Sequence, residues 1–189
     1  MEMNVFFDIN RPKRRKMQSY GREAVQQRMR LAMAFLNPLR EVIAEGWSVQ
    51  GKGNRSKAFG QALRALMQEA LSGHYPDQYV LAERVLISSG MLPGVQVDRA
   101  VCEEQYLKIA YSGETTPLTS DSDEVVLVVY SPEAGVAGRN TEVFCRRDGQ
   151  VRAKLPPQLR RQPFHAYLFV HDRRKRMFSK SIYAGYFAG

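Results

Sequence analysis

The stretch Glu124-Val125-Val126-Leu127-Val128-Val129-Tyr130 decides the fold of this chain, together with Ala166-Tyr167-Leu168-Phe169-Val170. Both stretches are rich in the β-branched and aromatic residues that favour strands. A period of two along each stretch predicts that both are strands of an antiparallel β-domain. Further strand candidates recur outward from them between turn signals, at about 95–101, about 104–111, 141–147, 150–155 and 179–187.

Short strands at this spacing predict an antiparallel, immunoglobulin-like β-sandwich domain over residues 95–189. Asp148-Gly149 carries the two-residue signal of a hairpin turn. Alternation should divide five residues between inner and outer faces: Val126, Val128, Tyr130, Tyr167 and Phe169.

Apolar residues spaced three or four apart predict two helices ahead of the sandwich. The first runs over 20–45 and is kinked or divided at Pro38. The second follows a Gly-rich connection at 46–56 and ends at Gly73. A trailing strand is expected at 79–88. We expect these helices to pack together, or against the sheet, through Met29, Met33, Leu36, Phe59, Leu63 and Leu66.

The expected fold class is therefore α+β, with a basic N-terminal arm and two helices followed by the sandwich. Residues 1–94 would hold the arm, the two helices and the trailing strand, and residues 95–189 would hold the sandwich. The length of 189 residues permits this division, since single domains commonly have about 100–200 residues.

Basic residues gather in two blocks around a mildly acidic middle. The chain has 28 Lys and Arg against 19 Asp and Glu, a formal net charge of +9. Residues 1–40 carry nine bases against three acids, and residues 160–180 carry seven against one. Two such blocks predict a polyanion-binding surface if they meet in space. The candidate binding residues are Arg11, Lys13, Arg14, Arg15, Lys16, Arg173, Arg174, Lys175 and Arg176.

Aromatic residues lie close to these bases along the chain. Lysine and arginine residues interleaved with aromatic residues can bind single-stranded nucleic acid, because the cations contact phosphates and the rings stack on the nucleobases. Strand alternation explains the same rings equally well as core residues of the sandwich. The rings concerned are Tyr20, Phe164, Tyr167, Phe169 and Phe178.

No motif in the sequence predicts catalysis or a cofactor. Cys102 and Cys145 lack zinc spacing and are expected to be free thiols. The acidic group Asp121, Asp123 and Glu124 lacks the spacing of a calcium loop, and no G-x-S-x-G element is present. Enzyme, metal and cofactor functions are therefore not expected. No segment predicts a membrane span or a signal peptide, which favours a cytoplasmic location.

Several motifs occur together in a recognisable order. They are Arg11-Pro12-Lys13, the run from Gln26 to Leu39, Ala70-Leu71-Ser72-Gly73-His74-Tyr75-Pro76-Asp77, the run from Val85 to Gly94, Val126-Leu127-Val128-Val129-Tyr130 and Ser179-Lys180-Ser181-Ile182-Tyr183-Ala184-Gly185. With these motifs, residues of about 11–187 resemble the uncharacterised Bacteroidetes family labelled domain of unknown function 6266. The resemblance implies no activity, because the family has no established one. The C-terminal strand pattern also resembles fibronectin type III and immunoglobulin-like sandwiches.

The expected function is a non-enzymatic interaction or assembly protein. Its basic surface would bind nucleic acid or an acidic protein partner. The alternative is a purely structural or adhesive component, associated with a mobile element or a surface, whose charge serves solubility. Convergence of the bases into one patch would separate the two functions.

Overall fold

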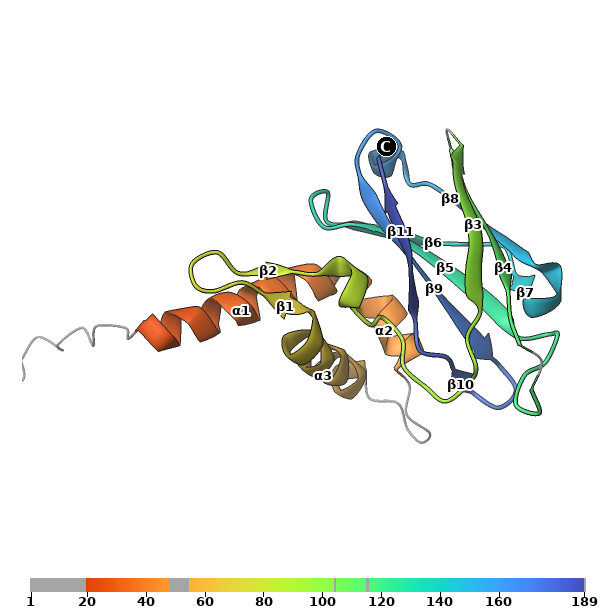
Figure 1. Ribbon diagram of the computed structural model, residues 1–189, viewed down its shortest axis with the longest axis horizontal. Coiled ribbons are helices and arrows are strands. Elements are labelled where there is room, and N and C mark those ends of the chain that lie inside the picture. Colours follow the sequence, from red (N-terminus) through yellow and green to blue (C-terminus); the bar gives the residue numbers. More distant parts are fainter. Residues whose placement is uncertain (1–19, 48–54, 104, 115, 189) are drawn as a thin grey trace, which may run out of the picture.

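The computed structural model describes residues 20–47, 55–103, 105–114 and 116–188, and its architecture is α+β (Figure 1). The helices are α1 (Tyr20–Leu36), α2 (Arg40–Gly46) and α3 (Arg55–Ala65). The strands are β1 (Leu71–Ser72), β2 (Tyr79–Val80), β3 (Gln96–Glu103), β4 (Tyr106–Ser112), β5 (Glu124–Ser131), β6 (Val136–Arg139), β7 (Phe144–Cys145), β8 (Gln150–Lys154), β9 (Phe164–Asp172), β10 (Met177–Phe178) and β11 (Ile182–Phe187).

The predicted break at Pro38 is confirmed. A 3₁₀ turn, Asn37–Leu39, separates α1 from α2, with Pro38 in its first positions. Proline fits there because its ring fixes φ and it needs no hydrogen-bond acceptor for an N–H. Chain direction therefore changes between α1 and α2, and both helices can place apolar residues on the same sheet.

The segment after α3 is less regular than the sequence predicts. A π-helical turn, Leu66–Ala70, extends α3, and Gly73 follows with a φ of +80°. Only Tyr79 and Val80 of the expected strand at 79–88 pair as a strand, with β1. Residues Ala82–Arg84 form a 3₁₀ turn. The prediction of one continuous strand is wrong because Ala82, Val85 and Ile87 place their side chains in the core without their backbone pairing with a neighbouring strand.

Two antiparallel sheets form the C-terminal half. The larger sheet has β5 and β9 at its centre, paired from Glu124 opposite His171 to Tyr130 opposite His165. Strands β10 and β11 pair with the other edge of β9, and β6 and β7 with the other edge of β5. The smaller sheet has the order β3-β4-β8. The prediction of an antiparallel β-region after two helical segments is confirmed at this level.

The larger sheet is the middle layer of the protein. One face, with Leu127 and Leu168, packs on the smaller sheet, and the other face packs on the helices. The five residues expected to divide between two faces, Val126, Val128, Tyr130, Tyr167 and Phe169, all belong to the core shared with the helices. Alternation predicts that one face of this strand pair is exposed, but Val125–Tyr130 are buried on both faces. The reason is that a strand between two apolar layers needs apolar residues at every position.

The apolar stripe predicted for the first helix is buried over only part of its length. Leu36 is fully buried and Met33 partly so, but Val25 is 61% exposed and Met29 44% exposed. The expectation that Met29 is a core residue is therefore wrong. The first half of α1 projects beyond the sheets, and the β1–β2 hairpin lies along it (Figure 1). The other members of the predicted cluster, Phe59, Leu63 and Leu66, lie in or against the core.

Two further strand predictions need correction. Only Phe144 and Cys145 of 141–147 form a strand, and Val136–Arg139 form a strand that the pattern did not predict. Asp148 and Gly149 do not join two paired strands, because β7 pairs with β5 and β8 pairs with β4. The Asp-Gly signal instead marks a crossing from one sheet to the other, at which Gly149 takes a φ of +64°.

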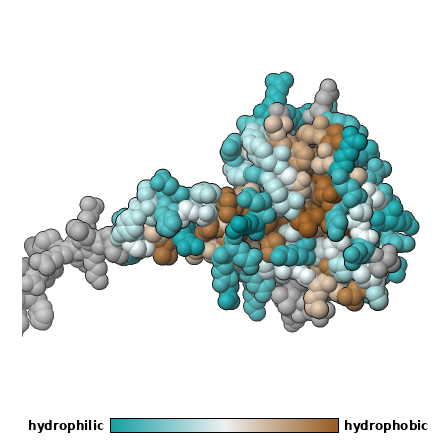
Figure 2. All heavy atoms as spheres, in the orientation of Figure 1, coloured by the Kyte–Doolittle hydropathy of each residue, from teal (hydrophilic) through white to brown (hydrophobic). Residues whose placement is uncertain are grey.

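The two sheets meet again where β11 lies beside β3. Apolar residues gather along this edge in Figure 2, and Val97, Ile182 and Phe187 pack there partly buried against the core between the sheets. Most of the projecting part of α1 is polar in the same view.

Candidate functional site

The nine candidate binding residues fall in two places. Arg11, Lys13, Arg14, Arg15 and Lys16 lie outside the described residues. The structure therefore does not bear on the convergence of the two basic blocks. Arg173, Arg174, Lys175 and Arg176 form the turn between β9 and β10, and all four are exposed. We call these four residues the basic turn.

Asp172 fixes the shape of the basic turn. Its Oδ1 accepts hydrogen bonds from the backbone amides of Arg174 (2.9 Å) and Lys175 (3.1 Å), and Lys175 Nζ lies 3.6 Å from its Oδ2. Burial favours the neutral carboxyl, but the two amides and the Lys175 charge outweigh it and lower the pKa of Asp172. Arg176 closes the turn with a φ of +52°. The carboxylate is thus a structural element of the turn.

Ion pairs neutralise half of the charge of the basic turn. Arg173 pairs with Glu124, with Nη2 3.0 Å from Oε1, and Lys175 pairs with Asp172. Within the part of the chain that the structure describes, neither Arg174 nor Arg176 forms an ion pair. Two guanidinium groups at the tip of the turn are therefore available to an external anion.

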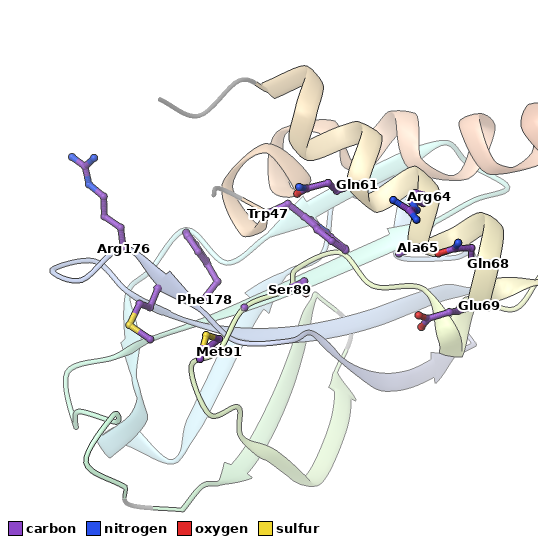
Figure 3. A pocket seen from close by; sticks show the side chains of 12 residues that line it. Trp47, Gln61, Arg64, Ala65, Gln68, Glu69, Ser89, Met91, Arg176 and Phe178 are labelled. Atoms are coloured by element: carbon purple, nitrogen blue, oxygen red, sulfur yellow. The ribbon is translucent and has the colours of Figure 1, made fainter. Parts of the chain in front are cut away.

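A cleft of about 660 Å³ opens beside the basic turn (Figure 3). Residues of α3 form one wall, and the Ser89–Met91 segment and β10 form the other. Trp47, which follows α2, lies between the two walls. The lining residues are Trp47, Gln61, Arg64, Ala65, Gln68, Glu69, Ser89, Gly90, Met91, Arg176, Met177 and Phe178.

Buried serine hydroxyls hold the floor of the cleft together. The Ser88 hydroxyl lies 2.7 Å from the carbonyl oxygen of Ser179 and 3.1 Å from that of Gly46. The Ser181 hydroxyl accepts a hydrogen bond from the amide of Ile87 (3.0 Å). These bonds connect the end of α2 to the link between β10 and β11, so helices and sheet form one rigid floor.

Gly90 permits a close approach at the same place. A Cβ atom at this position would overlap the backbone carbonyl of Phe178. At Gly46 it would lie only 2.7 Å from Cβ of Ser88. Both glycines therefore let the 88–91 segment lie directly against its neighbours, which leaves room for the cleft above it.

Charge is distributed unevenly along the cleft. Arg176 extends outward at one end, Arg64 lies in the α3 wall, and Glu69 lies at the opposite end (Figure 3). No ion pair involving Arg64 is present among the described residues. Trp47, the single tryptophan of the chain, contributes the largest aromatic surface. Among the described residues the cleft therefore combines the aromatic side chain of Trp47 with a free cation on either side of it, and the carboxylate of Glu69 lies at the Arg64 end.

A second, smaller cleft offers a contrast. It has about 430 Å³ and lies between α1, β2 and the turn after β5. Tyr79, Glu83 and His165 line it, and no lysine or arginine does. Its chemistry therefore does not suit an anionic ligand.

Four of the five aromatic residues near the basic residues are core residues of the strands. Phe164, Tyr167, Phe169 and Phe178 are buried, and the Phe178 ring stacks on His171 with 4.2 Å between centroids. Their place in the strands is that of core residues. Tyr20 is 66% exposed and donates a hydrogen bond to the carbonyl oxygen of Tyr75, far from the basic turn.

The acidic group at 121–124 has a structural role. Asp123 is buried and pairs with Arg146 at 3.4 Å, while it also accepts a hydrogen bond from the amide of Ser120. Glu124 is the partner of Arg173. No group of His, Cys, Asp or Glu among the described residues could hold a metal ion. Cys102 and Cys145 are free thiols, as expected, although Cys102 lies on the surface.

No described helix is long and apolar enough to cross a membrane. Searches with the sequence and the structure match no protein-family model, no curated protein and no solved structure. The resemblance stated above therefore stays a prediction.

Sequence reasoning found two residues of the cleft, Arg176 and Phe178, and missed the others. Arg64 and Met91 carry no local signal, because α3 and the 88–91 segment meet only in three dimensions. Trp47 was accessible in principle as the only tryptophan, placed directly after the helix-ending Gly46. A lone tryptophan is most often a core residue, however, and only the cleft distinguishes it.

Proposed function

We propose that the chain is a non-enzymatic interaction protein that binds nucleic acid through the basic turn. The observation that carries this proposal is the pair of exposed guanidinium groups of Arg174 and Arg176, which have no ion-pair partner in the described ranges, with Arg64 across the adjoining cleft. Guanidinium groups bind phosphates with paired hydrogen bonds. The net charge of +9 favours encounter with a polyanion over the whole surface.

A salt series tests the proposal. Binding of random-sequence DNA and RNA, single- and double-stranded, is measured by fluorescence anisotropy of labelled oligonucleotides. Affinity should fall steeply with salt, and Arg174→Ala with Arg176→Ala should reduce it for every sequence. Loss of two phosphate contacts should flatten the slope of log K against log salt by about 1.4 for single strands.

A matched variant removes the same charge elsewhere. Lys154 and Arg161 are exposed at the end of the β-region away from the basic turn. Lys154→Ala with Arg161→Ala should leave the slope nearly unchanged. Equal effects of the two double variants would mean that net charge alone attracts the polymer, and the proposal would fail.

The rival function is a structural or adhesive component whose charge serves solubility. It draws support from the neutralisation of Arg173 and Lys175 by Glu124 and Asp172. Absence of binding at low salt would favour it. Binding to polyglutamate in preference to nucleic acid would instead indicate an acidic protein partner.

We further infer immunoglobulin-like connectivity for the β-region. With β7 and β10 left out, the order β3-β4-β8 corresponds to strands A-B-E, and β6-β5-β9-β11 to C′-C-F-G. This order supports the inference. An experimental structure in which β8 pairs with β9 would contradict it. A sandwich of this kind would present the basic turn at one end, where such folds carry their binding loops.

A further inference from the structure

We infer that the cleft beside the basic turn is a binding site for single-stranded nucleic acid, in which one base stacks on Trp47. This inference rests on the proposed function and adds the class of nucleic acid and the residue that selects it. The phosphates flanking the stacked base would contact Arg176 and Arg64. The site unites three residues that the sequence separates, from the end of α2, from α3 and from the β9–β10 turn.

The size and composition of the cleft suit a single strand. Its volume of about 660 Å³ lies within the range of ligand-binding pockets. An aromatic face beside free cations is the combination that proteins use for single strands, because every base has a face that stacks. The smaller cleft, lined by Tyr79 and Glu83, has an aromatic residue but no lysine or arginine.

The Trp47 side chain is divided between the core and the cleft. It is only partly buried and packs with one part against the helix-sheet core. Its Nε1–H is buried, and no acceptor for it occurs in the described ranges of the chain. A buried N–H does not reach a ligand in the cleft, so the part of the ring that lines the cleft is what Trp47 offers to a bound base.

The geometry favours a single strand over a duplex. Bases within a duplex are stacked on each other and cannot reach an aromatic wall without being extruded, which costs a few kcal/mol. A duplex can contact the exposed tip of the basic turn, but its paired bases cannot stack on the ring of Trp47. Single strands should therefore gain from the cleft, while duplexes should gain only from Arg174 and Arg176.

Glu69 sets the direction in which the strand would lie. Its carboxylate is at the end of the cleft opposite Arg176, and it repels phosphates there. The phosphate path should thus run between Arg176 and Arg64 and avoid Glu69. Glu69→Gln should strengthen single-strand binding, whereas Glu83→Gln in the smaller cleft makes the same charge change away from the site.

The single tryptophan provides a direct reading of the site. A labelled oligothymidylate of 15 nucleotides is titrated with the full-length protein, and tryptophan fluorescence and label anisotropy are recorded together. We expect quenching of Trp47 that saturates with the anisotropy. A duplex of the same length should raise the anisotropy with little quenching.

Substitution of Trp47 separates stacking from structure. Trp47→Ala should weaken single-strand binding roughly 5- to 100-fold, with little effect on the duplex. Trp47→Phe keeps an aromatic face and should restore most of the affinity. Tyr79→Ala, which removes an exposed aromatic ring from the smaller cleft, is the matched control. Thermal melts of each variant report whether the fold persists.

Each outcome decides between the two proposals. Binding that depends on Arg174 and Arg176 without quenching of Trp47 would overturn the cleft inference and leave the proposed function standing. Equal losses for single strands and duplexes in Trp47→Ala would do the same. Absence of any nucleic-acid binding would overturn both. If Trp47→Ala does not fold, quenching in the unaltered protein and the affinity of Trp47→Phe decide.

Discussion

The central strands β5 and β9 and the helix α1 carry similar amounts of apolar sequence and use it differently. Every residue from Val125 to Ser131 is buried, because β5 lies between the helices and the smaller sheet. The stripe of α1 is buried only toward its C-terminal end, where the helix reaches the sheet. Apolar patterning thus identifies the element, while its position among the layers decides how much of it is covered.

The largest expected loss of stability comes from a substitution in the middle layer, the larger sheet. Phe169 of β9 is 1% exposed and packs between strand and helices. Phe169→Ala should lower the free energy of unfolding by about 3–5 kcal/mol, since it leaves a large cavity between two layers. Urea denaturation followed by circular dichroism measures the loss. A change below about 1 kcal/mol would mean that the helices do not cover this face in solution.

Two residues on the same stripe of α1 sharpen the comparison. Leu36 is fully buried, and Val25 is 61% exposed. Leu36→Ala should cost about 2–5 kcal/mol, whereas Val25→Ala should change stability by at most about 0.5 kcal/mol. The same denaturation series gives both numbers. A large loss from Val25→Ala would show that a further surface covers the projecting half of α1.

The smallest expected effects come from two buried tyrosines of the middle layer. The Tyr167 hydroxyl donates a hydrogen bond to the carbonyl oxygen of Ala82 at 2.9 Å. Among the described residues the Tyr130 hydroxyl has no partner, and burial raises its pKa to about 12. Tyr167→Phe should therefore cost about 0.5–1.5 kcal/mol, and Tyr130→Phe should cost nothing or stabilise the protein. Equal losses from the two substitutions would contradict the assignment of partners.

Local chemistry explains what the sequence could predict. Pro38 divides the first helix because proline lacks an N–H. The second helical segment was expected to end at Gly73 but ends at Ala70, where Leu71 takes an extended conformation and begins β1. The two apolar stretches form strands as predicted. These features depend on a few adjacent residues, so a single sequence is sufficient to find them.

Layering explains what the sequence could not predict. The sequence of Val125–Tyr130 does not show whether one or both faces of the strand are covered. The second face is covered because the helices pack on it, and that contact is not encoded locally. Asp148 and Gly149 specify a tight turn without specifying which strands it joins. The cleft needs Trp47, Arg64 and Arg176 in one place, and no spacing along the chain encodes that.

The double burial of β5 has a consequence for the nascent chain. Six consecutive apolar residues, Val125–Tyr130, form the kind of segment that pairs with copies of itself into cross-β aggregates when exposed. The helices that cover one of its faces, and strands β3 and β4 of the sheet that covers the other, precede it along the chain, whereas β9, which pairs with its edge, follows about 40 residues later. During synthesis the faces can therefore be covered before that edge is paired, and the strand is flanked by Asp123, Glu124 and Pro132. Charges and prolines at such positions oppose self-association.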